Sequence, residues 1–202
     1  HALRVVPGNA PDEAAHVEYA LHLAEKGELP VSRWPAEPLS YESFQPPLYY
    51  GAAALVLRCT RPLPLKVQFL ALRLFSGLLH LGALFFVCAL GRRLAGGDGF
   101  EALCCAAAVP MFFFIGATVT NDAAANFAGA ALLWRVVRVP RPARPRDAIF
   151  TGAAVGAALL CKMTLLPIVA VSLAALVDLR RGRRAGSAVR LASALGAALC
   201  LC

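Results

Sequence analysis

The chain has 202 residues, of which 59% are hydrophobic and only 16% are charged, and its mean hydropathy is +0.64. Soluble domains are about half apolar and carry about a quarter charged residues, so this composition is typical of a membrane protein. The net charge is +8, but its distribution argues against a nucleic-acid-binding protein, because the arginines lie in short gaps between apolar runs and form no continuous basic face with interleaved aromatic residues. A positive-inside bias explains these arginines better.

The seven cysteines mostly lie within apolar runs, their number is odd, and no C-x-x-C pair occurs. Neither a zinc site nor a disulfide framework is therefore indicated, and we expect them to be small buried hydrophobic residues. The chain begins without Met, shows no secretory signal and stops inside an apolar run at 195–202. We expect a fragment of a longer membrane protein, truncated at both ends.

Residues 1–45 form a polar, Pro-rich segment that holds seven of the twelve acidic residues. We predict a helix that is capped by Asn9, opens at 11–16 (Pro-Asp-Glu-Ala-Ala-His) and ends at Gly27. Asp12 and His16 are four residues apart, so a helix places them on one face, with Glu13 alongside. The predicted apolar stripe of this amphipathic helix consists of Ala14, Val17, Leu21 and Ala24. A purely structural explanation is that first-turn acids favour the positive end of the helix dipole.

The remaining chain predicts an all-α integral membrane protein, a multi-span helical bundle preceded by this extracytoplasmic loop. A short helix over 46–59 is expected at the membrane interface, because a span needs about 20 residues. The apolar runs within 68–202 predict transmembrane helices at 68–91, 101–118, 123–137, 148–161 and 165–178, followed by a truncated span.

The order of charges predicts the topology. If the 46–59 helix lies along the membrane, the arginines at 92–93, 138–146 and 180–184 all face the cytoplasm, as the positive-inside rule requires. Asp12, Glu13, Asp122 and Lys162 then all face the opposite side.

Asp122 and Lys162 interrupt apolar runs, where ionisable groups are costly unless they are solvated or functional. Asn121 or Asp122 can alternatively act only as the N-cap of a helix that begins at Ala123. Lys162 can snorkel to the interface or bind a phosphate as a point charge.

Several motifs in this order resemble the GT-C membrane glycosyltransferases, in the protein mannosyltransferase and aminoarabinose transferase branch that is called glycosyltransferase family 39-like. The similarity covers nearly the whole chain. The sequence departs from the family pattern in having no acid directly before Pro46-Pro47, where Glu42 is the nearest. The motifs that carry the resemblance are 11–19, 27–30, 45–50 (Gln-Pro-Pro-Leu-Tyr-Tyr), 73–76 (Arg-Leu-Phe-Ser), 121–123 (Asn-Asp-Ala) and 162–164 (Lys-Met-Thr).

The resemblance implies that residues 1–202 are part of a transmembrane catalytic domain that transfers a sugar, with inversion, from a polyprenyl-phosphate donor to a hydroxyl group of a lipid, polysaccharide or protein acceptor. It implies an active site on the extracytoplasmic face of the membrane, in a bacterial plasma membrane. Such a reaction needs a general base for the acceptor proton and a cation near the leaving phosphate.

By the same resemblance, Asp12 is the expected base, with Glu13 and Asp122 as further catalytic residues. Lys162 and Arg73 are candidates for stabilising the phosphate. His16, Gln45 and Tyr49 complete the expected substrate-binding residues. A divalent cation (Mg, Mn or Zn) bound by Asp12, Glu13 and His16 is also considered, since carboxylates plus imidazole suit such a metal.

Two other interpretations stay open. The chain can be a non-enzymatic transporter or lipid-scaffolding protein, although transporters place ionisable groups near the bilayer midplane on broken helices. It can also be a relative of these enzymes that has lost activity.

Overall fold

The computed structural model describes residues 10–31, 41–140 and 144–180, and these residues form helices and connecting turns without any β-strand. The elements, in chain order, are α1 (Glu13–Lys26), α2 (Leu48–Thr60), α3 (Leu65–Ala95), α4 (Phe100–Ala107), α5 (Pro110–Gly116), α6 (Asn121–Val137), α7 (Pro145–Cys161), the 3₁₀ turn η1 (Met163–Leu165) and α8 (Leu166–Arg180).

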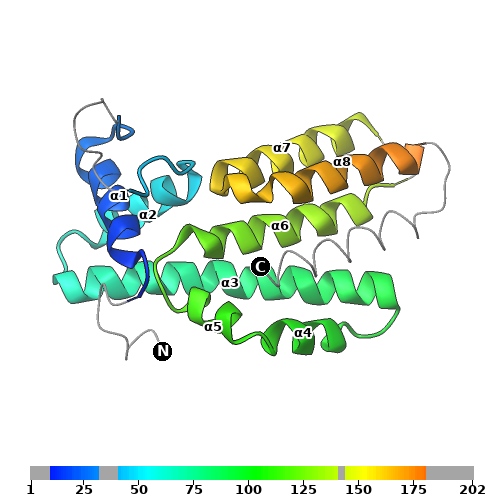
Figure 1. The fold of residues 1–202 in the computed structure, drawn as a ribbon, viewed down its shortest axis with the longest axis horizontal. Coiled ribbons are helices and arrows are strands. Elements are labelled where there is room, and N and C mark those ends of the chain that lie inside the picture. The colour runs from blue at the N-terminus through cyan, green and yellow to red at the C-terminus, as the bar shows by residue number, and fades with distance from the viewer. Residues whose placement is uncertain (1–9, 32–40, 141–143, 181–202) are drawn as a thin grey trace.

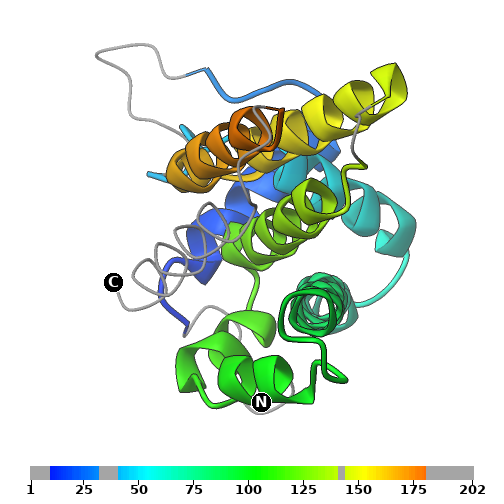
Figure 2. The ribbon, with the colours of Figure 1, turned by 90° about the vertical axis from the view of Figure 1, so that its right-hand side faces the viewer.

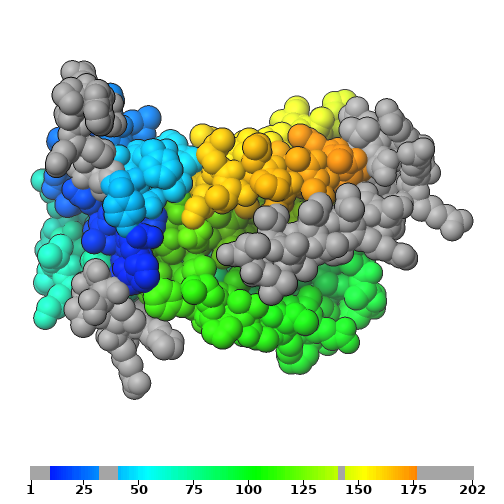
Figure 3. Space-filling view, viewed as in Figure 1, coloured from blue at the N-terminus to red at the C-terminus, as the bar shows by residue number. Residues whose placement is uncertain are grey.

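The helices form layers around α3 (Figure 1). Viewed along α3, the pair α4–α5 lies on one side of it, and α6 followed by α7 and α8 lies on the other (Figure 2). The segment α1–α2 covers the end of these layers at which α6 begins and α7 ends (Figure 3). The first helix therefore closes one end of the bundle.

The predicted 68–91 span is confirmed as a helix, since α3 is 31 residues long and apolar enough to cross a membrane. In its most apolar stretch of 18 residues, only 17% of the residues are buried. Leu74, Leu78 and Phe85 are among its exposed side chains. A helix this apolar and this uncovered suits contact with lipid better than contact with water.

The predicted span over 101–118 is wrong as a single helix. The chain breaks between α4 and α5, where Val109 takes an extended conformation with φ −87° and ψ 107°. Pro110 causes the break, because its ring restricts the preceding residue and it has no N–H to continue a helix. The two pieces have 8 and 7 residues.

The other predicted helices form, but they are short. α2 has 13 residues, as expected for a helix that does not span, whereas α6, α7 and α8 have 17, 17 and 15. In the described part of the chain, α3 is thus the one helix that meets the length and hydropathy of a span. The expected final span at 195–202 lies outside the described residues.

The first helix is rotated relative to the prediction. Gly27 ends it in a left-handed conformation with φ 73°, as predicted, and the expected cap Asn9 lies outside the described residues. The stripe was misassigned, however, because Ala14 and Leu21 are exposed while Glu13, His16 and Ala20 are buried. Contacts with α2 and α3 decide which face is buried.

The cysteines are also less buried than expected. Cys161 is buried, whereas Cys59, Cys104 and Cys105 are exposed and Cys88 is half-buried. All five are free thiols. An exposed thiol on an apolar helix is acceptable where lipid, and not water, surrounds it.

Candidate functional site

The site is built on a buried ion pair that joins α1 to α3. Arg73 donates from Nε to Oε1 of Glu13 at 2.9 Å and from Nη2 to Oε2 at 2.8 Å. The backbone N–H of Val119 also donates to Oε1 of Glu13, at 3.0 Å. Glu13 is fully buried and Arg73 is 3% exposed. Both residues were predicted to act on substrate, and the structure instead commits their polar atoms to holding α1, α3 and the 118–120 segment together.

His16 is the second buried residue on this face of α1. Its Nδ1 lies 2.8 Å from the hydroxyl of Tyr50 on α2, and the ring of Tyr19 stacks on that of Tyr50 at 3.9 Å. Burial lowers the pKa of His16 from its usual 6.5, which favours the neutral form of the ring. Burial likewise raises the pKa of the Tyr50 hydroxyl.

Besides burial, which has the largest effect, the charges of four other side chains also affect the pKa of His16. Glu42 raises it most, Asp122 also raises it, Lys162 lowers it and Asp12 raises it. These residues come from segments that are far apart in the sequence.

Glu42 is the member of this group that the sequence analysis did not include among the site residues. Its Oε2 is buried and has no hydrogen-bond partner among the described residues. The one signal in the sequence was its position as the nearest acid before Pro46-Pro47.

Asp122 and Lys162 form a direct ion pair. The Nζ atom of Lys162 lies 2.6 Å from Oδ1 of Asp122, and their side chains are 19% and 40% exposed. The predicted capping role is wrong for Asp122, because α6 begins at Asn121 and Thr120 is its N-cap, accepting from the Asp122 N–H at 3.2 Å. The carboxylate of Asp122 therefore faces Lys162 and the Thr120 hydroxyl, at a partly open position.

Asp12 lies just outside the helix and is exposed. It is the one non-glycine residue with a positive φ (62°) among the described residues. This left-handed residue is the N-cap of α1, one residue before the helix that carries the buried Glu13 and His16. The hydroxyl of Tyr41 donates to Asp12 Oδ1, and this bond raises the pKa of Tyr41 to about 12.

Tyr49 and Gln45 occupy supporting positions. Tyr49 is buried, and its hydroxyl lies 2.9 Å from Oγ of Ser76. The backbone carbonyl of Gln45 accepts from the hydroxyl of Tyr19 at 3.3 Å. These contacts fix the entry into α2 beneath His16.

The expected metal ligands do not come together. The described residues contain no group of three His, Cys, Asp or Glu side chains that is able to hold a metal ion. Glu13 is engaged by Arg73 and Val119, and Asp12 lies outside the buried face. The residues Asp12, Glu13 and His16 therefore do not fit a common divalent cation.

An apolar cavity of about 210 Å³ lies between α2, α3, α6 and α7. Leu48, Phe75 and Phe127 contribute to its wall. Cys161, which directly precedes Lys162, and Ala124, two residues after Asp122, also line it. A charged group at the edge of an apolar cavity suits a ligand that is polar at one end and hydrocarbon at the other.

Comparison with known proteins identifies the family of the chain. The family model described as dolichyl-phosphate-mannose-protein mannosyltransferase matches residues 45–202. No curated protein and no solved structure matches the chain. The match begins after α1, and the contacts Glu13–Arg73 and His16–Tyr50 join α1 to the matched part. The chain therefore belongs to the dolichyl-phosphate-mannose-protein mannosyltransferase family, a GT-C family of membrane-embedded glycosyltransferases.

Proposed function

We propose that this chain transfers a sugar from a polyprenyl-phosphate-linked donor to a hydroxyl acceptor, with inversion at the anomeric carbon. The observation that carries the proposal is the partly exposed ion pair between Asp122 and Lys162, close in sequence to Ala124 and Cys161 of the apolar cavity, together with the exposed Asp12. It supplies proton acceptors, a cation and a hydrocarbon surface, which are the three things that such a donor and acceptor require.

Asp12 is the proposed general base. Its carboxylate is exposed, so an acceptor hydroxyl is able to approach it, and a non-glycine residue with positive φ is often found at a functional position. In the proposed step, Asp12 takes the hydroxyl proton, the acceptor oxygen bonds to the anomeric carbon, and the bond from that carbon to the phosphate oxygen breaks. The polyprenyl phosphate leaves with the electron pair.

Lys162 is the proposed phosphate contact. Its ammonium group pairs with the carboxylate of Asp122, and both side chains are partly exposed, so a phosphate is able to share the ammonium with Asp122. Asp122 then positions Lys162. We assign no donor contact to Arg73, because its guanidinium is buried against Glu13.

We further propose that the chain is part of a multi-span protein of a bacterial plasma membrane, with this cluster on the extracytoplasmic side. The arginines at the ends of α3 and α6 lie at the opposite end of the bundle, which supports this orientation (Figure 1). Asp122 and Lys162 flank helix ends and do not interrupt the middle of a span, which favours the transferase over a transporter.

The test is transfer from a panel of labelled polyprenyl-phosphate sugars by the purified protein in detergent. Asp12→Asn should lower the rate by about 100-fold or more, because a general base contributes a factor of about 10²–10⁴. Glu18→Gln is the matched control: Glu18 is an exposed acid on the same helix, and its variant should keep the wild-type rate.

Two outcomes would contradict the assignment. An unchanged rate in Asp12→Asn removes Asp12 as the base, and a rate lost only in Asp122→Asn transfers that role to Asp122. If the folded wild type transfers none of the sugars, the proposed activity itself fails.

A further inference from the structure

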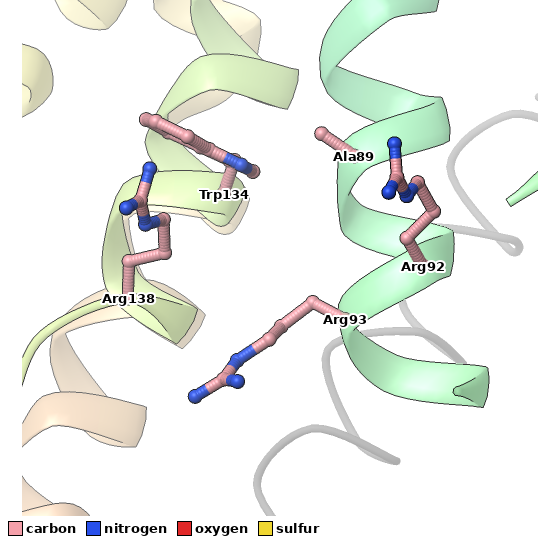
Figure 4. Close-up of a pocket in the computed structure, with 5 residues that line it drawn as sticks. All are labelled: Ala89, Arg92, Arg93, Trp134 and Arg138. Carbon is pink, nitrogen blue, oxygen red and sulfur yellow. The ribbon is translucent and has the colours of Figure 1, made fainter. Parts of the chain in front are cut away.

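A basic pocket lies at the end of the bundle away from the candidate site, between the C-terminal ends of α3 and α6 (Figure 4). Its volume is about 480 Å³, and Ala89, Arg92, Arg93, Trp134 and Arg138 line it. Nothing in the proposed sugar transfer uses these residues. Within the described ranges, no carboxylate pairs with any of the three arginines, since the ion pair at this end joins Arg135 to Asp147.

The two helices present their arginines differently. Arg93 extends from α3 toward α6, and Ala89, one turn earlier, leaves the space between the helices open (Figure 4). On α6, the guanidinium of Arg138 lies over the ring of Trp134, 4.5 Å from its centroid. Such a cation–π contact holds one guanidinium in place without neutralising its charge.

General rules explain why arginines occur here but not why they meet. Arginines near helix C-termini are favoured by the helix dipole, and arginines on the cytoplasmic side by the positive-inside rule. Neither rule requires three of them, from two helices, to line one pocket. Like charges that share a pocket repel each other, and a bound anion removes that repulsion. The planar guanidinium group is also the side chain best suited to bind phosphate oxygens in pairs.

The surface next to the pocket is hydrocarbon. Phe86 packs against Trp134 at 5.2 Å and against Phe85 at 5.4 Å, between ring centroids. Phe85 is 65% exposed, and Leu81, one turn farther from the arginines, is 62% exposed. The basic pocket thus continues into an exposed apolar strip along α3. Free phosphate has no apolar part to contact such a strip, whereas a phospholipid can place its acyl chains along it.

We propose that this pocket binds the headgroup phosphate of an anionic phospholipid, with the acyl chains along Phe85 and Leu81. Basic pockets between helices at the cytoplasmic side of a membrane are suited to such headgroups. This site is separate from the proposed sugar-transfer site and lies at the other end of α3 (Figure 1). Its occupancy does not depend on whether the chain transfers a sugar.

The experiment titrates the detergent-purified protein with phosphatidylglycerol, phosphatidylcholine or inorganic phosphate and counts bound lipid by native mass spectrometry. Phosphatidylglycerol should bind with defined stoichiometry and the other two should not. Arg93→Gln/Arg138→Gln should weaken phosphatidylglycerol binding about 25-fold, since each arginine near a lipid surface contributes a factor of about five. Arg93→Gln alone removes no hydrogen bond or ion pair within the described ranges, so it should fold like the wild type; it should weaken binding about fivefold.

Arg146→Gln is the matched control, because Arg146 is exposed at the same end of the bundle but does not line the pocket. It should bind phosphatidylglycerol like the wild type. If Arg146→Gln weakened phosphatidylglycerol binding as much as the pocket variants do, the effect would come from overall surface charge, and the proposed site would be wrong. Wild-type binding by both pocket variants, equal binding of phosphatidylcholine, or binding of inorganic phosphate in place of the lipid would overturn it as well.

Discussion

Glu13 and Arg73 are 60 residues apart in the sequence and form a two-pronged ion pair with N–O distances of 2.9 and 2.8 Å. Their side chains are 0% and 2% exposed, respectively. The pair attaches α1, which precedes the range matched by the family model, to the long helix α3. It therefore fixes where Asp12 and His16 lie relative to Asp122 and Lys162.

Removing one partner of this pair should strongly destabilise the protein. Arg73→Met leaves the Glu13 carboxylate buried without its cation, and breaking a buried pair in this way costs about 3–5 kcal/mol. Arg61→Met, at an exposed position after α2, should change the free energy of unfolding by about 0.5 kcal/mol or less. Denaturant unfolding in mild detergent compares the two. Equal stability of both variants would show that the pair does not anchor α1.

Two ion pairs join the same helices, and their removal should have different effects. Lys162–Asp122 lies at the end with the candidate site, and Arg135–Asp147 lies at the other end of α6 and α7. Asp122→Asn should lower sugar transfer at least about tenfold, with little loss of stability, because a partly exposed pair contributes about 0–1 kcal/mol. Asp147→Asn should keep the transfer rate but lower Tm, because it also loses the bond to the Arg144 N–H that begins α7.

The comparison of transfer rate and Tm in these two variants separates function from stability. Parallel losses of rate and Tm in Asp122→Asn would assign the Asp122–Lys162 pair a structural role only.

The stability of the protein should fall below about pH 6.5 because of His16. Burial lowers the pKa of this side chain in the folded state, so the unfolded chain binds the proton more readily. The contribution of His16 is thus complete above pH 6.5 and is lost as the pH falls toward the folded-state pKa. His16→Gln should flatten the decline of Tm between pH 7 and pH 5, whereas His22→Gln on the same helix serves as a control. An unchanged slope in His16→Gln would exclude His16 as its source.

The tyrosines should resist ionisation in alkaline solution. The chain has four, all in the segment outside the predicted spans. Burial raises the pKa of Tyr19, Tyr49 and Tyr50, and the bond to Asp12 raises that of Tyr41 to about 12. Each keeps its proton more tightly when folded, so their contribution to stability is complete below pH 10 and is lost as the pH rises above it.

Tyrosinate absorbance should consequently rise only above pH 10, together with loss of helix measured by circular dichroism. If any tyrosine ionised near pH 10 while the protein stayed folded, the burial or hydrogen bond described for that tyrosine would be wrong.

The sequence by itself determined those features that depend on local signals. Gly27 ends α1, the apolar run around residue 80 forms the long helix α3, and α2 is too short to span. The order of charges also predicted that Asp122 and Lys162 lie at one end of the bundle. Pro110 was a local signal as well, and the prediction of a continuous 101–118 helix gave it too little weight against hydropathy.

Tertiary structure decided which side chains of α1 face the protein. Hydrophobic periodicity placed Leu21 inside, but Glu13 and His16 are buried because Arg73 and Tyr50 supply partners for their polar atoms. It also buried Oε2 of Glu42 and left Asp12 exposed at an N-cap with a left-handed backbone conformation. The spacing of apolar residues along the chain predicts which of them are buried. A buried charge, in contrast, is stable only beside a partner that folding brings from elsewhere in the sequence.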